Sequence, residues 1–190
     1  MDIKIEKTSI DDVVIVSHST FEDDRGFFME VFHKDIFAKA GLHINVVQQN
    51  HSRSTKNVLR GLHYQWDPPM GKLMRVTLGI AFFVAVDIRI GSPTLGKYFS
   101  VILKDSDRKQ VWAPAGFARG FYVLSEYSEI QYSCTGTYND DSESGIAWND
   151  PAIGIKWPTE NPILSNKDAN AQTLDQWLED PNSKNFKFKN

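Results

Sequence analysis

The sequence lacks several features that mark specialised classes of protein. A single cysteine, Cys134, excludes an internal disulfide and any site built from paired thiolates. The 21 basic and 24 acidic residues leave a net charge of −3, which argues against general binding to nucleic acid or to an anionic membrane. The N-terminus has no signal-peptide run, and the most apolar stretch, Gly79–Val86, is too short to span a membrane. We therefore expect a soluble, cytoplasmic protein in a reducing compartment.

What is present is ordinary for a globular chain. The 190 residues correspond to about one domain, so we expect residues 1–190 to form a single unit. Hydrophobic residues make up 41% and charged residues 24%, which excludes a disordered chain, a coiled coil and a collagen-like repeat. The 12 Phe, 5 Trp and 6 Tyr favour β structure and a well-filled core.

Turn residues separate many short runs of β-branched and aromatic residues, a pattern typical of an all-β sandwich or barrel. A short helix is predicted at Lys34–Ala40, and a C-terminal one at Ala169–Glu179 with Asp168 as its N-cap. The predicted strands are Val13–His18, Phe27–Phe32, Asn45–Asn50, Val58–Gln65, Lys72–Leu78, Ala81–Ile90, Lys97–Leu103, Lys109–Ala113, Phe117–Leu124 and Ser128–Tyr138.

Strand alternation places several polar side chains on otherwise apolar faces. In the run 130–138 the odd positions are polar and outward, so Tyr132 and Tyr138 share the inward face. In the run 117–123 the inward face carries Arg119 among Phe and Val. Burying an unpaired guanidinium is costly, so Arg119 needs an anionic partner or a wet cavity. These faces favour a barrel with a ligand cavity over a solid core.

The histidines do not form a metal-binding pattern. There is no HExxH, and the places where a metal-binding cupin has its ligands read His63-Tyr64-Gln65 and PAGFAR, residues 114–119. Arg119 stands in the second ligand position, and a guanidinium has no lone pair for a metal. We expect neither a metal nor, because a GxGxxG fingerprint is missing, a dinucleotide cofactor.

His63 and Lys72 are the candidate chemical groups, although each also has an ordinary structural interpretation. A lone strand histidine is often a hydrogen-bonded core residue, and a lone lysine is usually a solvated charge. Strict alternation separates Arg60 from His63, unless Gly61 lies in a bulge that redirects the strand. The residues themselves therefore predict a cavity with a base, a cation and a tyrosine, but they do not identify its ligand or its reaction.

Taken together, several stretches resemble the dTDP-4-dehydrorhamnose 3,5-epimerase family over roughly residues 13–174. The resemblance implies a metal-free, cupin-like jelly roll that acts as a homodimer, without a cofactor, in dTDP-L-rhamnose and polysaccharide biosynthesis. The stretches are FEDDRGFF (21–28), QQNHSRS (48–54) running into VLRGLHYQ (58–65), VDIRIGSPT (86–94), WNDP (148–151), WP (157–158) and LSNKD (164–168).

The resemblance assigns chemical roles to four residues. The substrate is a dTDP-linked 4-keto-6-deoxyhexose, whose ketone acidifies the hydrogens at C3 and C5. His63 is the implied base and Asp168 the carboxylate that holds it, as in a Ser-His-Asp triad. Lys72 is implied to stabilise the enolate, and Tyr132 to return a proton on the opposite face.

The resemblance also implies a set of binding residues, with one departure from the family pattern. Arg119 replaces the usual histidine; it can bind phosphate or sugar oxygen but cannot exchange a proton near neutrality. The alternatives are a C3-only epimerase or one for another nucleotide sugar, a metal-dependent cupin, and a non-catalytic sugar-binding module. The other implied contacts are Arg25 and Arg60 to phosphates and sugar, Phe21 and Glu30 from the partner subunit, Gln48 and Asn50 to the nucleotide, Tyr138 stacked on thymine, and Lys167 at the nucleotide end.

Overall fold

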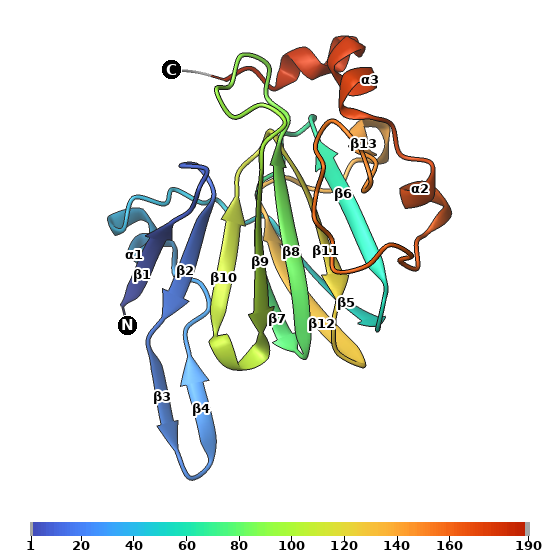
Figure 1. The fold of residues 1–190 in the computed structure, drawn as a ribbon. Helices are drawn as coiled ribbons and strands as arrows, with labels where there is room; N and C mark the ends of the chain where they lie inside the picture. The colour runs from blue at the N-terminus through green and yellow to red at the C-terminus, as the bar shows by residue number, and fades with distance from the viewer. Residues whose placement is uncertain (1, 189–190) are drawn as a thin grey trace.

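The computed structural model describes residues 2–188 and is mostly β structure (Figure 1). A six-stranded sheet has the order β1-β2-β10-β7-β12-β5, a five-stranded sheet the order β13-β6-β11-β8-β9, and β3 and β4 form a separate hairpin. The strands are β1 (Ile3–Lys7), β2 (Val14–His18), β3 (Thr20–Asp23), β4 (Gly26–Met29), β5 (Gln48–Thr55), β6 (Leu59–Gln65), β7 (Lys72–Leu78), β8 (Ile80–Asp87), β9 (Tyr98–Lys104), β10 (Lys109–Ala113), β11 (Phe117–Val123), β12 (Tyr127–Cys134) and β13 (Glu143–Gly145). The helices are α1 (Lys34–Lys39), α2 (Asn166–Ala169) and α3 (Leu174–Glu179), with 3-10 turns η1 (Asp105–Asp107), η2 (Asp140–Ser142) and η3 (Pro181–Asn185).

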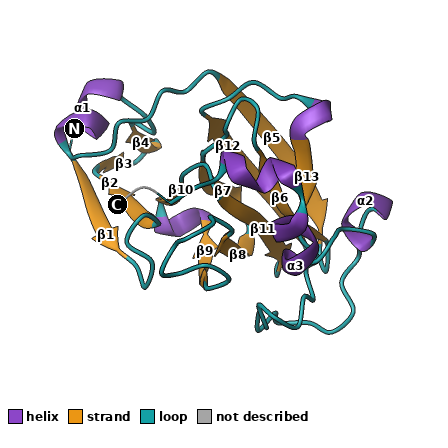
Figure 2. Cartoon of the chain, turned by 90° about the horizontal axis from the view of Figure 1, so that it is seen from above, coloured by secondary structure: helices purple, strands orange, loops and turns teal. Residues whose placement is uncertain are grey.

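The two large sheets face each other across an apolar core (Figure 2). Inward side chains such as Val76 and Ile130 from the six-stranded sheet meet Phe83 and Phe121 from the five-stranded sheet. Within the described residues no strand pair joins the two sheets into a closed barrel. The predicted cupin-like jelly-roll architecture is confirmed as an open, two-sheet form.

The C-terminal segment covers the outer face of the five-stranded sheet. The fully buried Trp177 of α3 packs on Tyr64, with ring centroids 4.5 Å apart, and its cluster includes Val86 and Ala118. Strands β8 and β11 are therefore buried on both faces, which explains why they read as nearly continuous apolar runs. None of the helices in residues 2–188 is long and apolar enough to span a membrane.

The predicted C-terminal helix is wrong in its start and in its cap. Two short helices replace it, because the intervening Gln172 pairs with Ile146 as an isolated bridge. Ser165 caps α2, and Thr173 forms a capping box at α3. Asp168 lies inside α2 and is not its N-cap, so its carboxylate is available for another contact.

The strand bounds were predicted best where apolar alternation is strong. Strands β7 and β10 have the predicted bounds. The predicted Ser128–Tyr138 is too long, because β12 ends at Cys134, opposite the first residue of β5. Tyr138 is 56% exposed, so the prediction that it shares an inward face with Tyr132 is wrong.

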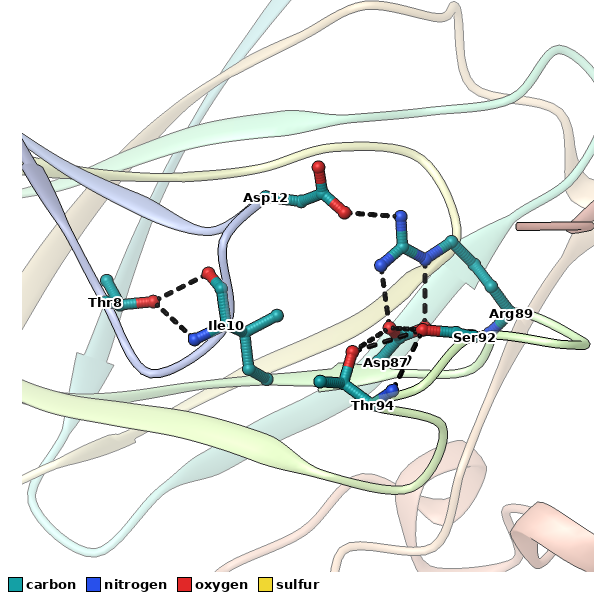
Figure 3. A network of polar contacts seen from close by, with 7 residues as sticks. All are labelled: Thr8, Ile10, Asp12, Asp87, Arg89, Ser92 and Thr94. Atoms are coloured by element: carbon teal, nitrogen blue, oxygen red, sulfur yellow. Dashed lines mark hydrogen bonds and ion pairs between the residues drawn. The ribbon is translucent and has the colours of Figure 1, made fainter. Parts of the chain in front are cut away.

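A polar network ties the end of β8 to the N-terminal part of the chain (Figure 3). The fully buried Asp87 accepts hydrogen bonds from Arg89, Ser92 and Thr94. Arg89 also reaches Asp12, which precedes β2. Burial opposes ionisation of Asp87, but these donors outweigh it and lower its pKa. The network fixes the sheet end next to the loop that leads into β11.

Candidate active site

A cavity of about 100 Å³ lies between the two sheets, and both sheets contribute to its wall. Strands β6 and β11 belong to the five-stranded sheet, and β7 and β12 to the six-stranded one (Figure 2). The lining side chains therefore come from both layers of the sandwich. The lining residues are Arg60, His63, Lys72, Met74, Arg119, Gly120, Phe121 and Tyr132. Five of the residues implied as catalytic or binding groups are thus brought to one place from four strands.

A bulge at Gly61 puts Arg60 and His63 on the same cavity. Arg119 pairs with His63 and Phe121 pairs with Arg60, so β6 carries one residue more than β11 between these pairs. Gly61 has φ +131°, and a Cβ there would lie 2.5 Å from the Cα of Gly120. Only glycine fits this position. The predicted bulge at Gly61, which places Arg60 and His63 on the same face of β6, is therefore confirmed.

His63 and Asp168 form a close pair at the cavity wall. The His63 Nε2 lies 2.6 Å from the Asp168 Oδ1, and the other carboxylate oxygen accepts a hydrogen bond from Ser165. Asp168 is buried while the His63 side chain is 27% exposed. Burial opposes ionisation of Asp168, but the bonds from His63, Ser165 and the Gly61 backbone lower its pKa overall. The ring is therefore oriented by a carboxylate, and its Nδ1 is the nitrogen left to exchange a proton with a ligand.

Lys72 and Tyr132 come from neighbouring strands opposite His63. The Lys72 Nζ lies 5.3 Å from the centroid of the Tyr132 ring. Withdrawal from water, reinforced by the nearby Arg119, lowers the pKa of Lys72 to about 8. Burial raises the pKa of Tyr132, although Arg60 and a hydrogen bond with Asn50 act in the opposite direction. At neutral pH the cavity thus holds a protonated phenol beside a cation that can lose its proton under mildly alkaline conditions.

Arg119 lies deep in the cavity wall, with 3% of its surface exposed. Its Nη1 donates to the backbone carbonyls of Met70, Ala113 and Pro114, at 2.7, 3.3 and 3.3 Å. Within residues 2–188 its Nε and Nη2 have no hydrogen-bond partner. The sequence predicted either an anionic partner or a cavity for the Arg119 side chain, and in the structure this side chain lines a cavity.

A row of polar side chains runs from the cavity to an exposed rim. Asn50 lies opposite Tyr132 in the strand register, Gln48 donates to Asn50 at 3.0 Å, and Gln48 accepts from the Tyr138 backbone at 2.8 Å. Gln48 and Asn50 therefore lie on one face of β5. Tyr138 is on the rim, where its hydroxyl donates to Asp140.

Lys167 reaches the same rim and pairs with Glu143, a residue that sequence reasoning missed. The Glu143 side chain is 12% exposed and acts electrostatically on Lys72, Tyr132 and Tyr138. It lies in β13, a strand of three residues that is too short to show any alternation. No local pattern could have revealed it, because its position follows from pairing with β6.

Three predicted binding residues lie away from the cavity of their own chain. Phe21 and Arg25 belong to the β3–β4 hairpin, which projects from the sandwich (Figure 1). Phe21 is 61% exposed, and Arg25 is held by Asp23 in the same hairpin. Glu30 follows β4 and contacts His18. The structure does not bring these residues to His63 within one chain.

No group of three or more His, Cys, Asp or Glu side chains in the described part of the chain is placed to hold a metal ion. The side chains named above define the proton-transfer chemistry of the cavity. A carboxylate-supported imidazole on one sheet and a phenol on the other line the same cavity, together with three cationic side chains. Such an arrangement suits proton transfer at a carbon next to a carbonyl group.

Comparisons with known proteins agree with this chemistry. A sequence profile of the dTDP-4-dehydrorhamnose 3,5-epimerase family matches residues 7–176. A dTDP-4-dehydrorhamnose 3,5-epimerase from Salmonella typhimurium is 50% identical over 175 residues, covering 90% of this chain and 96% of that protein.

Solved structures extend the similarity to the whole fold. A Legionella pneumophila dTDP-6-deoxy-D-glucose-3,5-epimerase in complex with dTDP-4-keto-L-rhamnose has a TM-score of 0.92 and 43% identity, covering 99% of each chain. A 3'-monoepimerase from Streptomyces bikiniensis in complex with dTDP-quinovose has a TM-score of 0.85 and 32% identity, covering 91% of this chain and 89% of that one. With a sandwich of this shape, a histidine–aspartate pair facing a tyrosine across its cavity, and similarity along nearly all of its length, the chain belongs to the dTDP-4-dehydrorhamnose 3,5-epimerase family.

Proposed function

We propose that the protein is an isomerase that inverts C3 and C5 of dTDP-4-dehydro-6-deoxy-D-glucose, giving dTDP-4-dehydro-L-rhamnose. The observation that carries the proposal is the placement of His63 and Tyr132 on facing sheets, around one cavity that also holds Lys72. Inversion needs a base on one side of a carbon and an acid on the other. Two groups from opposite walls meet that requirement, whereas two groups from one strand would not.

Each inversion proceeds through an enolate. The Nδ1 of His63 removes the hydrogen at C3 or C5 as a proton, and the electrons of the broken C–H bond move to the C4 oxygen. Lys72 stabilises the negative charge on that oxygen. The Tyr132 hydroxyl then gives its proton to the opposite face of the carbon, and solvent restores both side chains. No electrons are gained or lost overall, so the cycle requires no redox partner.

Electrostatics support the binding of an anionic substrate at this place. Three cationic side chains line the cavity, and within the described residues no carboxylate does so. A net charge of −3 for the whole chain is therefore compatible with a locally positive site. Arg60 at the cavity mouth fits the diphosphate, because guanidinium groups bind phosphate oxygens in pairs. Gln48, Asn50, Tyr138 and Lys167 continue toward the nucleotide end.

Incubation with the substrate in D₂O tests the proposal directly. Deuterium should appear at both C3 and C5, with formation of the L-configured product, when the reaction is followed by proton NMR. His63→Ala should abolish exchange at both carbons while dTDP binding is largely retained. Binding of the nucleotide by the wild-type protein without any exchange would contradict an enzymatic function and favour a sugar-binding module.

The second candidate is an epimerase that inverts C3 alone or acts on a related nucleotide sugar. The similarity to a 3'-monoepimerase favours keeping it, because that protein shares the fold at 32% identity. The same D₂O experiment separates the two candidates. Deuterium confined to C3 would replace the double epimerase by this alternative.

We further propose that the enzyme works as a cytoplasmic homodimer in which the β3–β4 hairpin completes the neighbouring site. The hairpin carries three exposed phenylalanines, Phe21, Phe27 and Phe28, which a lone subunit leaves in water. The proposal explains why Phe21, Arg25 and Glu30 lie away from the cavity of their own chain.

Mixing two inactive variants tests this exchange of residues. His63→Ala removes the base but keeps the hairpin, and a Phe21→Ala/Glu30→Ala variant keeps the base. Mixed after unfolding and refolding, they should regain about a quarter of wild-type activity, since half of the dimers are mixed and each has one intact site. A mixture without activity, with both variants dimeric, would contradict the sharing of residues between subunits.

A further inference from the structure

Among the described residues, Arg119 is hydrogen-bonded through Nη1 alone, and these bonds fix the direction of the rest of its guanidinium group. The Nη1 donates to three backbone carbonyls that come from two separate segments, at Met70 and at 113–114. The group is therefore rigid without being neutralised. Burial lowers the pKa of Arg119 only to about 10, so it stays charged at neutral pH.

The remaining nitrogens, Nε and Nη2, form the edge of a guanidinium that grips two oxygens at once. The same chain shows this use elsewhere. In Arg89 these two nitrogens donate to the two carboxylate oxygens of Asp87, at 3.0 and 2.7 Å, and in Arg25 they bind Asp23. In Arg119 the corresponding edge is buried and has no partner among residues 2–188. Because Arg119 is one of the cavity-lining residues, this unpartnered fork of donors belongs to the cavity wall.

The neighbours of Arg119 identify what such a fork would bind. Arg119 pairs with His63 in the strand register, so it lies beside the base, and it acts electrostatically on Lys72. The other titratable neighbour is Cys134, whose pKa is raised by burial, so its thiol stays neutral. A ligand that places two oxygens next to the reacting carbon would satisfy both free nitrogens.

The two enolates of the proposed reaction differ in this respect. Loss of the C3 hydrogen makes C3 and C4 trigonal, and their exocyclic oxygens, the C3 hydroxyl and the C4 enolate oxygen, then lie in one plane. Loss of the C5 hydrogen makes C4 and C5 trigonal instead, so C3 stays tetrahedral and its hydroxyl lies out of the enolate plane. The C4 oxygen is then the one exocyclic oxygen in that plane, because the oxygen on C5 belongs to the ring and is a weaker acceptor. A planar fork of donors matches the first enolate better than the second.

We propose that Arg119 is a specificity-determining residue whose Nε–Nη2 edge binds the C3 and C4 oxygens together and thereby favours proton transfer at C3 over C5. The inference rests on the proposed epimerase function and deepens it. Lys72 serves the C4 oxygen in both enolates, whereas the fork of Arg119 serves the enolate toward C3. A lysine ammonium in place of the guanidinium would lack the paired donors, and the preference for proton transfer at C3 over C5 would be lost.

Site-resolved deuterium exchange tests the proposal. Initial rates of exchange at C3 and C5 are measured by NMR for the wild type, Arg119→Gln and Arg119→Lys. Arg119→Gln should slow C3 exchange by about 30-fold or more and C5 exchange by less than about 5-fold. Arg119→Lys keeps a positive charge without the fork, so it should show the same preferential loss at C3. Met74→Leu, a volume-conserving change in the same cavity wall, should leave the ratio of the two rates unchanged.

The outcomes separate the inference from the proposed function. An equal loss at both carbons, or recovery of C3 exchange in Arg119→Lys, would overturn the role of the fork while the epimerase function stands. Absence of exchange in the wild type would instead overturn the function itself. Because Arg119 is buried, each variant is also checked by thermal unfolding and dTDP binding. The change in the C3:C5 ratio is read within one folded protein, so a general loss of folded material cannot produce it.

Discussion

Replacing Asp168 by asparagine isolates the electrostatic part of the histidine–aspartate pair. The substitution keeps the shape of the side chain but removes a buried negative charge that lies 2.6 Å from the His63 ring. In the proposed reaction His63 becomes a cation when it accepts the substrate proton, and the carboxylate stabilises that cation. At an effective dielectric constant of about 20, charges about 4 Å apart attract by about 4 kcal/mol. A loss of that size in the transition state corresponds to about a 10³-fold decrease in rate.

The assay is deuterium wash-in at C3 and C5 under single-turnover conditions, with dTDP affinity measured separately. Because Asp168 contacts His63 and is not itself a lining residue of the cavity, the decrease should appear in kcat while nucleotide affinity changes little. Ser165→Ala is the matched control. It removes a neutral hydrogen bond to the other oxygen of the same carboxylate and should cost less than about tenfold. Activity of Asp168→Asn within about threefold of the wild type would refute the assignment of Asp168 as the partner of the base.

Three further predictions concern the other groups described above. Tyr132→Phe should slow inversion by at least about 10²-fold, while deuterium still exchanges without inversion because the base on the opposite wall is intact. NMR reads the product configuration and the deuterium label together. An equal loss of inversion and of exchange would contradict the role of Tyr132 as the acid. Lys72 has a folded pKa of about 8, below its unfolded value, so the unfolded chain binds more protons between about pH 8 and 10.5 and stability should rise with pH across that window. Lys72→Met should therefore raise the free energy of unfolding at pH 7 by roughly 1–3 kcal/mol in urea titrations, and abolish turnover; a variant less stable than the wild type would contradict the lowered pKa. Asp87→Asn should lower the free energy of unfolding by about 3 kcal/mol, because it leaves Arg89 without its buried partner. Asp12→Asn, at the exposed side of the same arginine, should lower it by under about 1 kcal/mol. Similar losses in the two variants would contradict the burial argument.

The sequence predicted the interior of the sandwich well because alternation there is enforced by burial. Strands β7 and β10 were placed to the residue, and the possibility of a bulge at Gly61 followed from the spacing of Arg60 and His63. The polar strand β5 was placed too early. Its residues form a strand because β12 pairs with them along the whole length, and that pairing has no local signature.

The candidate site was predictable in its types of side chain but not in its contacts. Asp168 and His63 are in direct contact but lie 105 residues apart in the sequence. Before the structure, the resemblance to a family was therefore the one indication that they act as a pair. Glu143 was not predicted as a site residue, because its strand has only three residues and shows no alternation pattern. Tyr138 was placed on the inner face because alternation was extended past the point where the partner strand ends.

The segment that carries α2 and α3 connects the outer apolar layer to the histidine–aspartate pair. Trp177 of α3 is buried in that layer, and Asp168 of α2 contacts the His63 ring. A substitution that loosens this segment from the five-stranded sheet therefore exposes the buried tryptophan and leaves the imidazole without its carboxylate. Damage far from the cavity then lowers turnover as well as stability.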